Sequence, residues 1–170
     1  ASSLNGSFLI FVYNCKTNSL KVISDRFSSF ALYYAFDGFE FRAAMFLSDL
    51  IAMRRDAGLV INIDSAAIFE FIAMRRLFGV HTYEKNCLYL DSASILTLRV
   101  GEKQPEVTKY WTADYSTLAP RGRKLINAIS KSLSNTLKLH LSDDPKQRYG
   151  LFLSGGLDAR AVLAASVVQE

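Results

Sequence analysis

A short glycine turn near the end of the chain constrains the fold more than any other feature. Residues 151–165 read Leu-Phe-Leu-Ser-Gly-Gly-Leu-Asp-Ala-Arg-Ala-Val-Leu-Ala-Ala. The apolar run from Tyr149 to Leu153 predicts a strand, Ser-Gly-Gly predicts a turn, and the segment after it predicts a helix. In α/β proteins this order builds an anion site, because glycines let the backbone approach closely and the first amides of a helix are free.

The residues of this turn suit a phosphate group and a magnesium ion. Backbone amides around Ser154, Gly155 and Gly156 can form a concave nest for pyrophosphate, and the Ser154 hydroxyl can add a donor. Asp158 is expected in the first turn of the helix, where it either complements the helix dipole or holds Mg²⁺ beside the phosphates. An ordinary strand-to-helix turn capped by Ser154 is the alternative. The chain has neither a Walker A sequence nor Gly-x-Gly-x-x-Gly, so a nucleotide site would be of another type.

Composition limits the class of protein. Half of the 170 residues are hydrophobic, yet charged residues interrupt every long apolar run, so we expect a real core and no membrane contact. The net charge of +4 comes from scattered basic residues, which favours solvated faces over a nucleic-acid surface. Cys15 and Cys87 have no metal-ligand spacing, so we expect two reduced, buried or half-buried thiols in a cytoplasmic protein. With no initiator Met and no visible signal peptide, we expect a piece of a longer chain.

The first part of the chain predicts antiparallel strands around two helices. Residues 7–14 and 20–24 predict two strands, and residues 32–36 and 39–42 predict a hairpin around the two-residue turn Asp37-Gly38. One helix is expected from residue 47 or 48 to residue 57. Another is expected from the N-cap Asp64 to Phe78, and the aromatic and Met side chains of both helices are expected to face the core. Further strands are expected at residues 87–90, 94–100 and 107–111.

A polar stretch then marks a domain boundary. Residues 112–120 are polar and end at Pro120. Beyond them, apolar residues at helical spacing predict a helix from about residue 122 to residue 141, which residues 142–145 end. We therefore predict two domains, residues 1–113 and residues 114–170.

Several motifs of the chain resemble motifs of one protein family and occur in the same order as in that family. Residues 154–159, Ser-Gly-Gly-Leu-Asp-Ala, resemble the PP-loop (Ser-Gly-Gly-x-Asp-Ser) of the ATP pyrophosphatases, most closely that of the asparagine synthetase family. Leu4–Phe8 resembles that family's Leu-Asn-Gly-x-Phe, and residues 24–34 resemble its Asp-Arg-x-Gly-x-x-Pro-Leu-Tyr-Tyr. Tyr110-Trp111 resembles the Tyr-Trp that closes its glutaminase domain. Two departures are Ala31 in place of proline and Ala159 in place of the second serine. Loss of a hydrogen bond to a charged group weakens affinity roughly tenfold to a hundredfold.

The resemblance implies an α+β domain followed by an α/β domain. Residues 1–113 would be the C-terminal portion of a glutamine amidotransferase-like domain, with the N-terminal-nucleophile αββα sandwich of antiparallel sheets and helices. Residues 114–170 would begin an asparagine-synthase-like PP-loop domain of the adenine nucleotide alpha hydrolase type. Nucleotide binding would fall to Leu153, Ser154, Gly155, Gly156, Leu157, Asp158 and Ala159, with Asp158 as the metal ligand.

The same resemblance implies an ATP- and Mg²⁺-dependent amide-forming ligase. It would transfer glutamine-derived ammonia to an adenylated carboxylate, with aspartate as the default acceptor. No catalytic residue is expected in this chain, because the family's nucleophile is an N-terminal cysteine that should lie upstream, and the chain alone is expected to be inactive. Asp25 and Arg26 are expected to be structural.

Two other hypotheses assume the same fold with a different activity. A β-lactam-synthetase-like or peptide-cyclase-like relative would use another acceptor. A non-catalytic nucleotide-binding homologue would fit the change at Ala159. The expected partners are small molecules (glutamine, ATP and a carboxylate such as aspartate), without nucleic acid or membrane, and a homodimer is left open.

Overall fold

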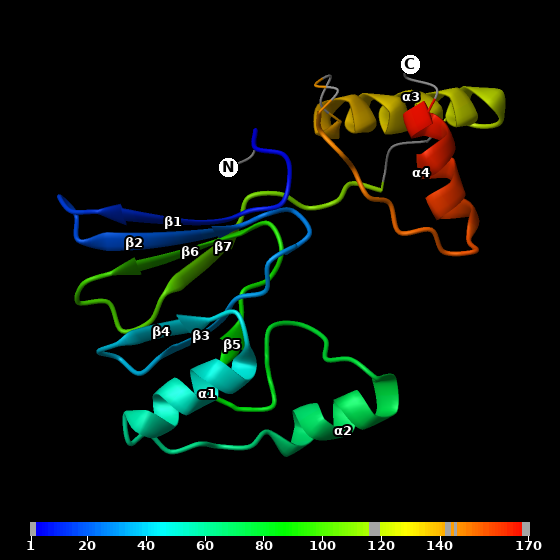
Figure 1. The fold of residues 1–170 in the computed structure, drawn as a ribbon. Helices are drawn as coiled ribbons and strands as arrows, with labels where there is room; N and C mark the ends of the chain where they lie inside the picture. Colours follow the sequence, from blue (N-terminus) through cyan, green and yellow to red (C-terminus); the bar gives the residue numbers. More distant parts are fainter. Residues whose placement is uncertain (1–2, 116–119, 142–143, 145, 168–170) are drawn as a thin grey trace. The chain divides into compact units, whose positions relative to one another are not determined.

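The chain forms two compact units, Ala1–Ala113 and Asp114–Glu170, in a computed structural model (Figure 1). The structure describes residues 3–115, 120–141, 144 and 146–167. Residues 142–145, which were expected to end the helix before them, lie largely outside the described residues. None of the described helices is long and apolar enough to cross a membrane.

Two antiparallel sheets build the first unit. The larger sheet has the strand order β1 (Leu9–Asn14), β2 (Ser19–Ser24), β6 (Ser94–Arg99) and β7 (Glu106–Lys109). The smaller sheet has the order β4 (Phe41–Ala44), β3 (Tyr33–Phe36) and β5 (Leu88–Tyr89). In the larger sheet β2 pairs Leu20 with both Tyr13 of β1 and Leu98 of β6, which fixes one register across three strands. The strands predicted in residues 1–113 are all present, with ends that differ by a few residues.

The β3–β4 hairpin is confirmed, but its tip lies one residue beyond the predicted turn. Phe36 pairs with Phe41, and the tip is Gly38-Phe39 between Asp37 and Glu40. The Asp37 carboxylate accepts hydrogen bonds from the backbone N–H of Phe39 at 3.0 Å and of Glu40 at 2.9 Å. Gly38 has a φ of +95°, a left-handed conformation that is open to glycine and strained for other residues. The Asp37 side chain, which precedes the two tip residues, therefore stabilises the turn through these hydrogen bonds.

The two helices of this unit begin where the sequence predicted. Helix α1 covers Leu47–Asp56, and α2 covers Ser65–Met74. The Asp64 side chain caps α2 by accepting hydrogen bonds from the backbone N–H groups of Ala66 and Ala67. The predicted end of α2 at Phe78 is wrong, because Arg75 adopts a left-handed conformation with a φ of 60° and stops the helix there.

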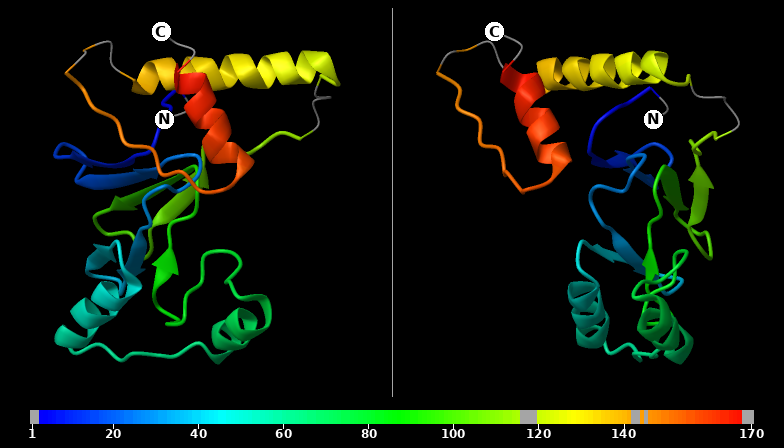
Figure 2. Two further views of the ribbon diagram at one scale, coloured as in Figure 1. Left: turned by 45° about the vertical axis from the view of Figure 1, so that its right-hand side comes forward. Right: turned by 90° about the vertical axis from the view of Figure 1, so that its right-hand side faces the viewer.

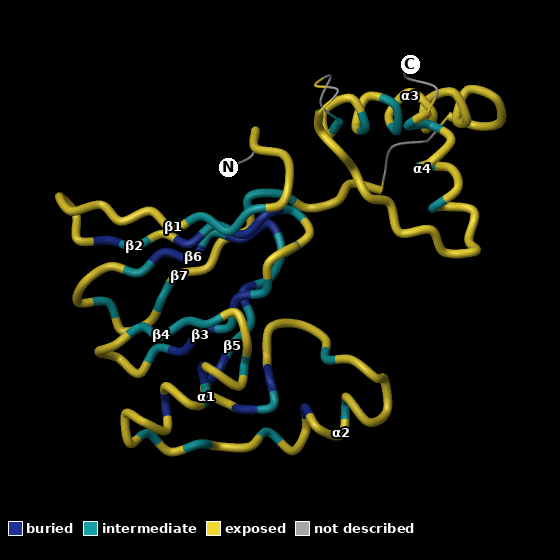
Figure 3. Tube along the Cα trace, viewed as in Figure 1, coloured by how far each residue is buried: buried dark blue, intermediate teal, exposed yellow. Residues whose placement is uncertain are grey.

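The buried residues lie in two clusters that separate three layers. Val22 and Leu96 of the larger sheet pack with Tyr34 of the smaller sheet, together with Leu32 and Leu90. On the other side of the smaller sheet, Ala35 and Cys87 pack against Leu50 of α1. Figure 3 shows these buried stretches along the strands and at the sheet-facing side of α1. The unit is thus an α+β assembly of two stacked sheets and a helical layer, whose arrangement Figure 2 shows from two further sides.

Two predictions about burial are wrong. Cys15 is exposed in the turn between β1 and β2, whereas Cys87 is buried as predicted. Met53 of α1 and most apolar side chains of α2 are also exposed: Phe69 is 72% exposed and Ile72 is 66% exposed. Only Ala67 of α2 is buried. Helix α2 is apolar almost all round, and no other described helix or strand packs against it, so most of its side chains remain exposed.

Two helices dominate the second unit. Helix α3 covers Arg123–His140, close to its predicted bounds, and α4 covers Leu157–Val167 directly after the glycine turn. The two helices contact each other, and no residue of either is fully buried. The strand predicted at residues 149–153 is not formed, because these residues pair with no strand among the described residues.

Candidate functional site

The glycine turn presents its polar groups to solvent at the start of α4. Ser154, Gly155, Gly156 and Leu157 are all exposed. The Ser154 hydroxyl accepts a hydrogen bond from the backbone N–H of Gly156 at 3.4 Å, which folds the turn back on itself. A Cβ atom added to Gly156 would lie 3.3 Å from that hydroxyl oxygen, so a larger residue would displace Ser154. The small size of Gly156 therefore keeps the turn compact.

The start of α4 supplies free donors beside this turn. The first N–H groups of an α-helix have no partner within the helix, and in α4 these include the N–H groups of residues 157–159. Arg160 directs its Nε back to the carbonyl oxygen of Gly156 at 3.4 Å, which places a cation at the same end of the helix. Amide donors, the positive end of the helix dipole and a guanidinium together suit an anion with several oxygens.

Asp158 lies in the first turn of α4, as predicted, and its side chain is exposed. In the described part of the chain it forms no ion pair, and no three His, Cys, Asp or Glu side chains come together as a metal site. A single carboxylate is enough for Mg²⁺ only when phosphate oxygens and water complete its shell. The donor set therefore fits a magnesium–nucleotide complex better than a metal ion alone. Ala159 is half-buried and offers no side-chain donor.

A second cluster forms around Asp25, at the junction of several loops. Its side chain is buried and accepts four hydrogen bonds, from the backbone N–H groups of Phe8, Phe27 and Ser29 and from the Ser29 hydroxyl, at 2.8–3.2 Å. Burial acts to raise the pKa of Asp25, but the backbone hydrogen bonds, led by that of Phe27, outweigh it and lower the pKa. Asp25 is therefore a structural anion that ties the start of β1 to the end of β2, as predicted.

The residues after Asp25 meet the end of the first unit. Trp111 lies edge-on to Phe27, with ring centroids 6.2 Å apart, and the guanidinium carbon of Arg26 lies 5.4 Å from the Trp111 ring centre. The Tyr110 hydroxyl donates a hydrogen bond of 2.8 Å to the carbonyl oxygen of Ser24. Two motifs that are more than eighty residues apart in the sequence thus form one contact network.

Two proteins of known family resemble this chain over nearly its whole length. The chain is 26% identical over 160 residues to a Methanocaldococcus jannaschii protein that is named provisionally as glutamine-hydrolysing asparagine synthetase 2. It is 22% identical over 166 residues to glutamine-hydrolysing asparagine synthetase 1 of Bacillus subtilis. The chain is similar to glutamine-hydrolysing asparagine synthetases. No protein-family model matches it.

The similarity covers almost all of this chain but a minor part of each relative. The matches include 94% and 98% of the chain, which corresponds to 30% and 25% of the two asparagine synthetases. The matched span therefore includes both the Asp25–Trp111 network and the glycine turn.

Sequence reasoning missed two features of the first unit. One is the buried ion pair of Glu84 and Arg54, whose closest charged atoms are 3.7 Å apart. Glu84 also accepts hydrogen bonds from the backbone of Asn62 and Asn86, which tie the segments before and after α2 together. Charged residues are mostly exposed, so nothing in the sequence marked this one as buried. The other is a cavity lined by Phe71 of α2 and by the segment that follows the end of this helix.

Proposed function

We propose that the chain belongs to an ATP-dependent amide-forming ligase of the asparagine synthetase type. The observation that carries the proposal is the Ser154–Asp158 turn at the start of an exposed helix, within a chain that resembles two asparagine synthetases over nearly its full length. ATP, when bound, would supply the activation of the acceptor carboxylate. Glutamine would supply the nitrogen and aspartate is the default acceptor.

Each residue of the turn has a defined task in this proposal. The amides of residues 155–158 and the Ser154 hydroxyl would hold phosphate oxygens, and Gly156 would keep the backbone close to them. Asp158 would bind Mg²⁺ together with the phosphates. Arg160, already directed toward the turn, would offset the remaining negative charge. Residues 1–113 would form part of the glutaminase domain, in which Asp25 and Trp111 have a structural role.

Calorimetry with the complete gene product tests the site. Asp158→Asn should weaken Mg-ATP binding at least tenfold, because a neutral amide is a poor ligand for a hard cation. Asp49→Asn is a matched control, since Asp49 is also an exposed carboxylate in the first turn of a helix but has no glycine turn before it. Equal Mg-ATP affinity of the Asp158 variant and the wild type would refute the site assignment.

Ala159 favours a second candidate, a nucleotide-binding protein without ligase activity. The family pattern places a serine there, and Ala159 removes one donor from the proposed phosphate site. Ala159→Ser restores that donor and should tighten Mg-ATP binding by about tenfold if a phosphate oxygen lies within reach. Binding of Mg-ATP by the wild type without any turnover in the presence of glutamine and a carboxylate acceptor would favour this candidate.

A further inference from the structure

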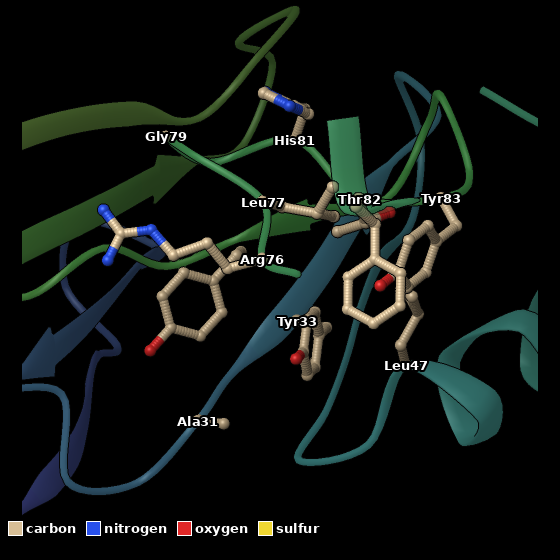
Figure 4. A pocket seen from close by; sticks show the side chains of 11 residues that line it. Ala31, Tyr33, Leu47, Arg76, Leu77, Gly79, His81, Thr82 and Tyr83 are labelled. Atoms are coloured by element: carbon tan, nitrogen blue, oxygen red, sulfur yellow. The ribbon is translucent and has the colours of Figure 1, made fainter. Parts of the chain in front are cut away.

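A cavity of about 370 Å³ lies in the first unit, where β3 and β5 meet the segment after α2 (Figure 4). This size is within the range of small-molecule sites, about 300–1,000 Å³. Its walls come from four separate segments of the chain, which all belong to the described residues. The residues of the glycine turn and of the Asp25–Trp111 network do not line it.

Four aromatic side chains, in two pairs, line the cavity. Tyr33 and Tyr89 pack with tilted rings 5.5 Å apart, and Phe71 and Tyr83 pack edge-on at 5.7 Å. Ring pairs of this kind hold each other in place and present both faces and edges to the space between them. A flat, apolar group is therefore the body that this cavity accommodates best.

The polar groups around the cavity are donors. Arg76 lines it, and its guanidinium is stacked 4.2 Å from the ring centre of Phe78, which fixes its direction. Within the described residues Arg76 forms no ion pair and no hydrogen bond, so its N–H groups are available. Figure 4 shows Arg76, Tyr33 and Tyr83 around the same space.

The tyrosine hydroxyls add to this donor set. Those of Tyr33 and Tyr83 have no hydrogen-bond partner in the described part of the chain, whereas that of Tyr89 donates to Ser28 at 2.8 Å. Burial, followed by the nearby Tyr89 and Tyr83 hydroxyls, raises the pKa of Tyr33, which keeps its proton in place at neutral pH. These hydroxyls can therefore donate to an acceptor inside the cavity.

No Asp or Glu lines the cavity. His81, which lines the cavity, contacts the Glu70 carboxylate through its ring nitrogen at 2.7 Å. A ligand with an amino group would find no acceptor of opposite charge among the lining residues, whereas a ligand with a carboxylate would meet Arg76. The walls thus select both an aromatic body and a negative charge.

We propose that this cavity binds a small aromatic monocarboxylate, with its ring among Tyr33, Tyr83 and Phe71 and its carboxylate on Arg76. This site goes beyond the proposed ligase function and does not depend on it. The cavity is a binding site rather than a catalytic one, since no Cys, Ser or Lys lines it and the Thr82 hydroxyl donates to the carbonyl oxygens of Glu84 and Cys87.

Titration calorimetry of the complete gene product with phenylacetate tests the proposal. Phenylacetamide, which lacks the charge, and phenylglycine, which adds an ammonium group, should each bind at least tenfold more weakly. Arg76→Gln should weaken phenylacetate binding tenfold or more. Arg55→Gln is the matched control, because Arg55 is an exposed arginine on α1 outside the cavity, and it should leave the affinity unchanged.

Tyr33→Phe provides a second test if the arginine variant fails to fold. It removes one hydroxyl and keeps the ring, and it should weaken phenylacetate binding about threefold to tenfold. Absence of saturable phenylacetate binding would overturn the proposal. So would binding that neither Arg76→Gln nor Tyr33→Phe alters, or competition by glutamine, which would mark the cavity as a site for that substrate. Loss of Mg-ATP binding by Asp158→Asn leaves this result unaffected, so the two proposals fail separately.

Discussion

Asp25→Asn removes the charge from the most heavily hydrogen-bonded side chain in the first unit. The asparagine keeps one acceptor oxygen, which can serve the Phe8 and Ser29 amides as Oδ2 does now. Its NH₂ group then faces the backbone N–H of Phe27, which donates to Asp25 at 2.8 Å in the native chain. One buried N–H is left unpaired at a cost of about 1–3 kcal/mol, and each of two remaining bonds loses about 1 kcal/mol with the charge. We therefore expect a loss of about 3–5 kcal/mol in the free energy of unfolding.

Urea unfolding followed by tryptophan fluorescence measures this loss directly. Trp111 is the one tryptophan of the chain, and it contacts Phe27 and Arg26 beside the substituted residue. Asp56→Asn serves as the control, since Asp56 is exposed at the end of α1, and it should change stability by less than about 0.5 kcal/mol.

The pH dependence of the unfolding free energy tests the role of Asp25 independently. The folded state lowers the pKa of Asp25, so the stabilisation is complete above the unfolded pKa of about 3.9 and is lost as the pH falls through the lower folded value. The difference between wild type and Asp25→Asn should therefore narrow as the pH falls below 4. Equal stability of the two proteins at pH 7, or a difference that widens in acid, would refute this account of Asp25.

Three further predictions concern the same unit. Glu84→Gln leaves the buried Arg54 without its anion and should cost about 3–5 kcal/mol in urea unfolding; a loss below 1 kcal/mol would contradict a buried pair. Asp64→Ala removes the cap of α2 and should cost about 0.5–2 kcal/mol, measured in the same way. A thiol reagent should modify exposed Cys15 in the folded chain but not Cys87, because burial, with Glu84, raises the pKa of Cys87 to about 12; two reactive thiols without denaturant would contradict this.

Local sequence signals predicted the elements whose ends are set locally. Helix α2 begins where the Asp64 side chain can cap it. Helix α3 coincides with the stretch that has apolar residues at helical spacing. The end of α2 could not be predicted in the same way. Arg75 adopts a left-handed conformation that arginine rarely takes, and the segment beyond it contributes to the cavity instead of another helical turn. The tertiary contacts outweigh the local preference there.

Long-range contacts account for the rest of what the sequence did not reveal. The Asp-Arg and Tyr-Trp motifs were visible one by one, but only the folded chain shows that Trp111 packs on Arg26 and Phe27. The aromatic and Met side chains of α2 were expected to face the core, yet no other described helix or strand packs against this helix and Ala67 is its one buried residue. The aromatic cavity depends on residues from four segments, whose spacing carries no periodic signal.

The most direct test of the proposed ligase is the release of AMP and pyrophosphate by the complete gene product. Mg-ATP, glutamine and aspartate are supplied together, and aspartate is left out of the control. The proposal predicts that AMP and pyrophosphate appear in equal amounts with asparagine, only when aspartate is present, and that Asp158→Asn abolishes them. Absence of AMP release with aspartate and with other carboxylate acceptors, from a protein that is folded, would contradict it.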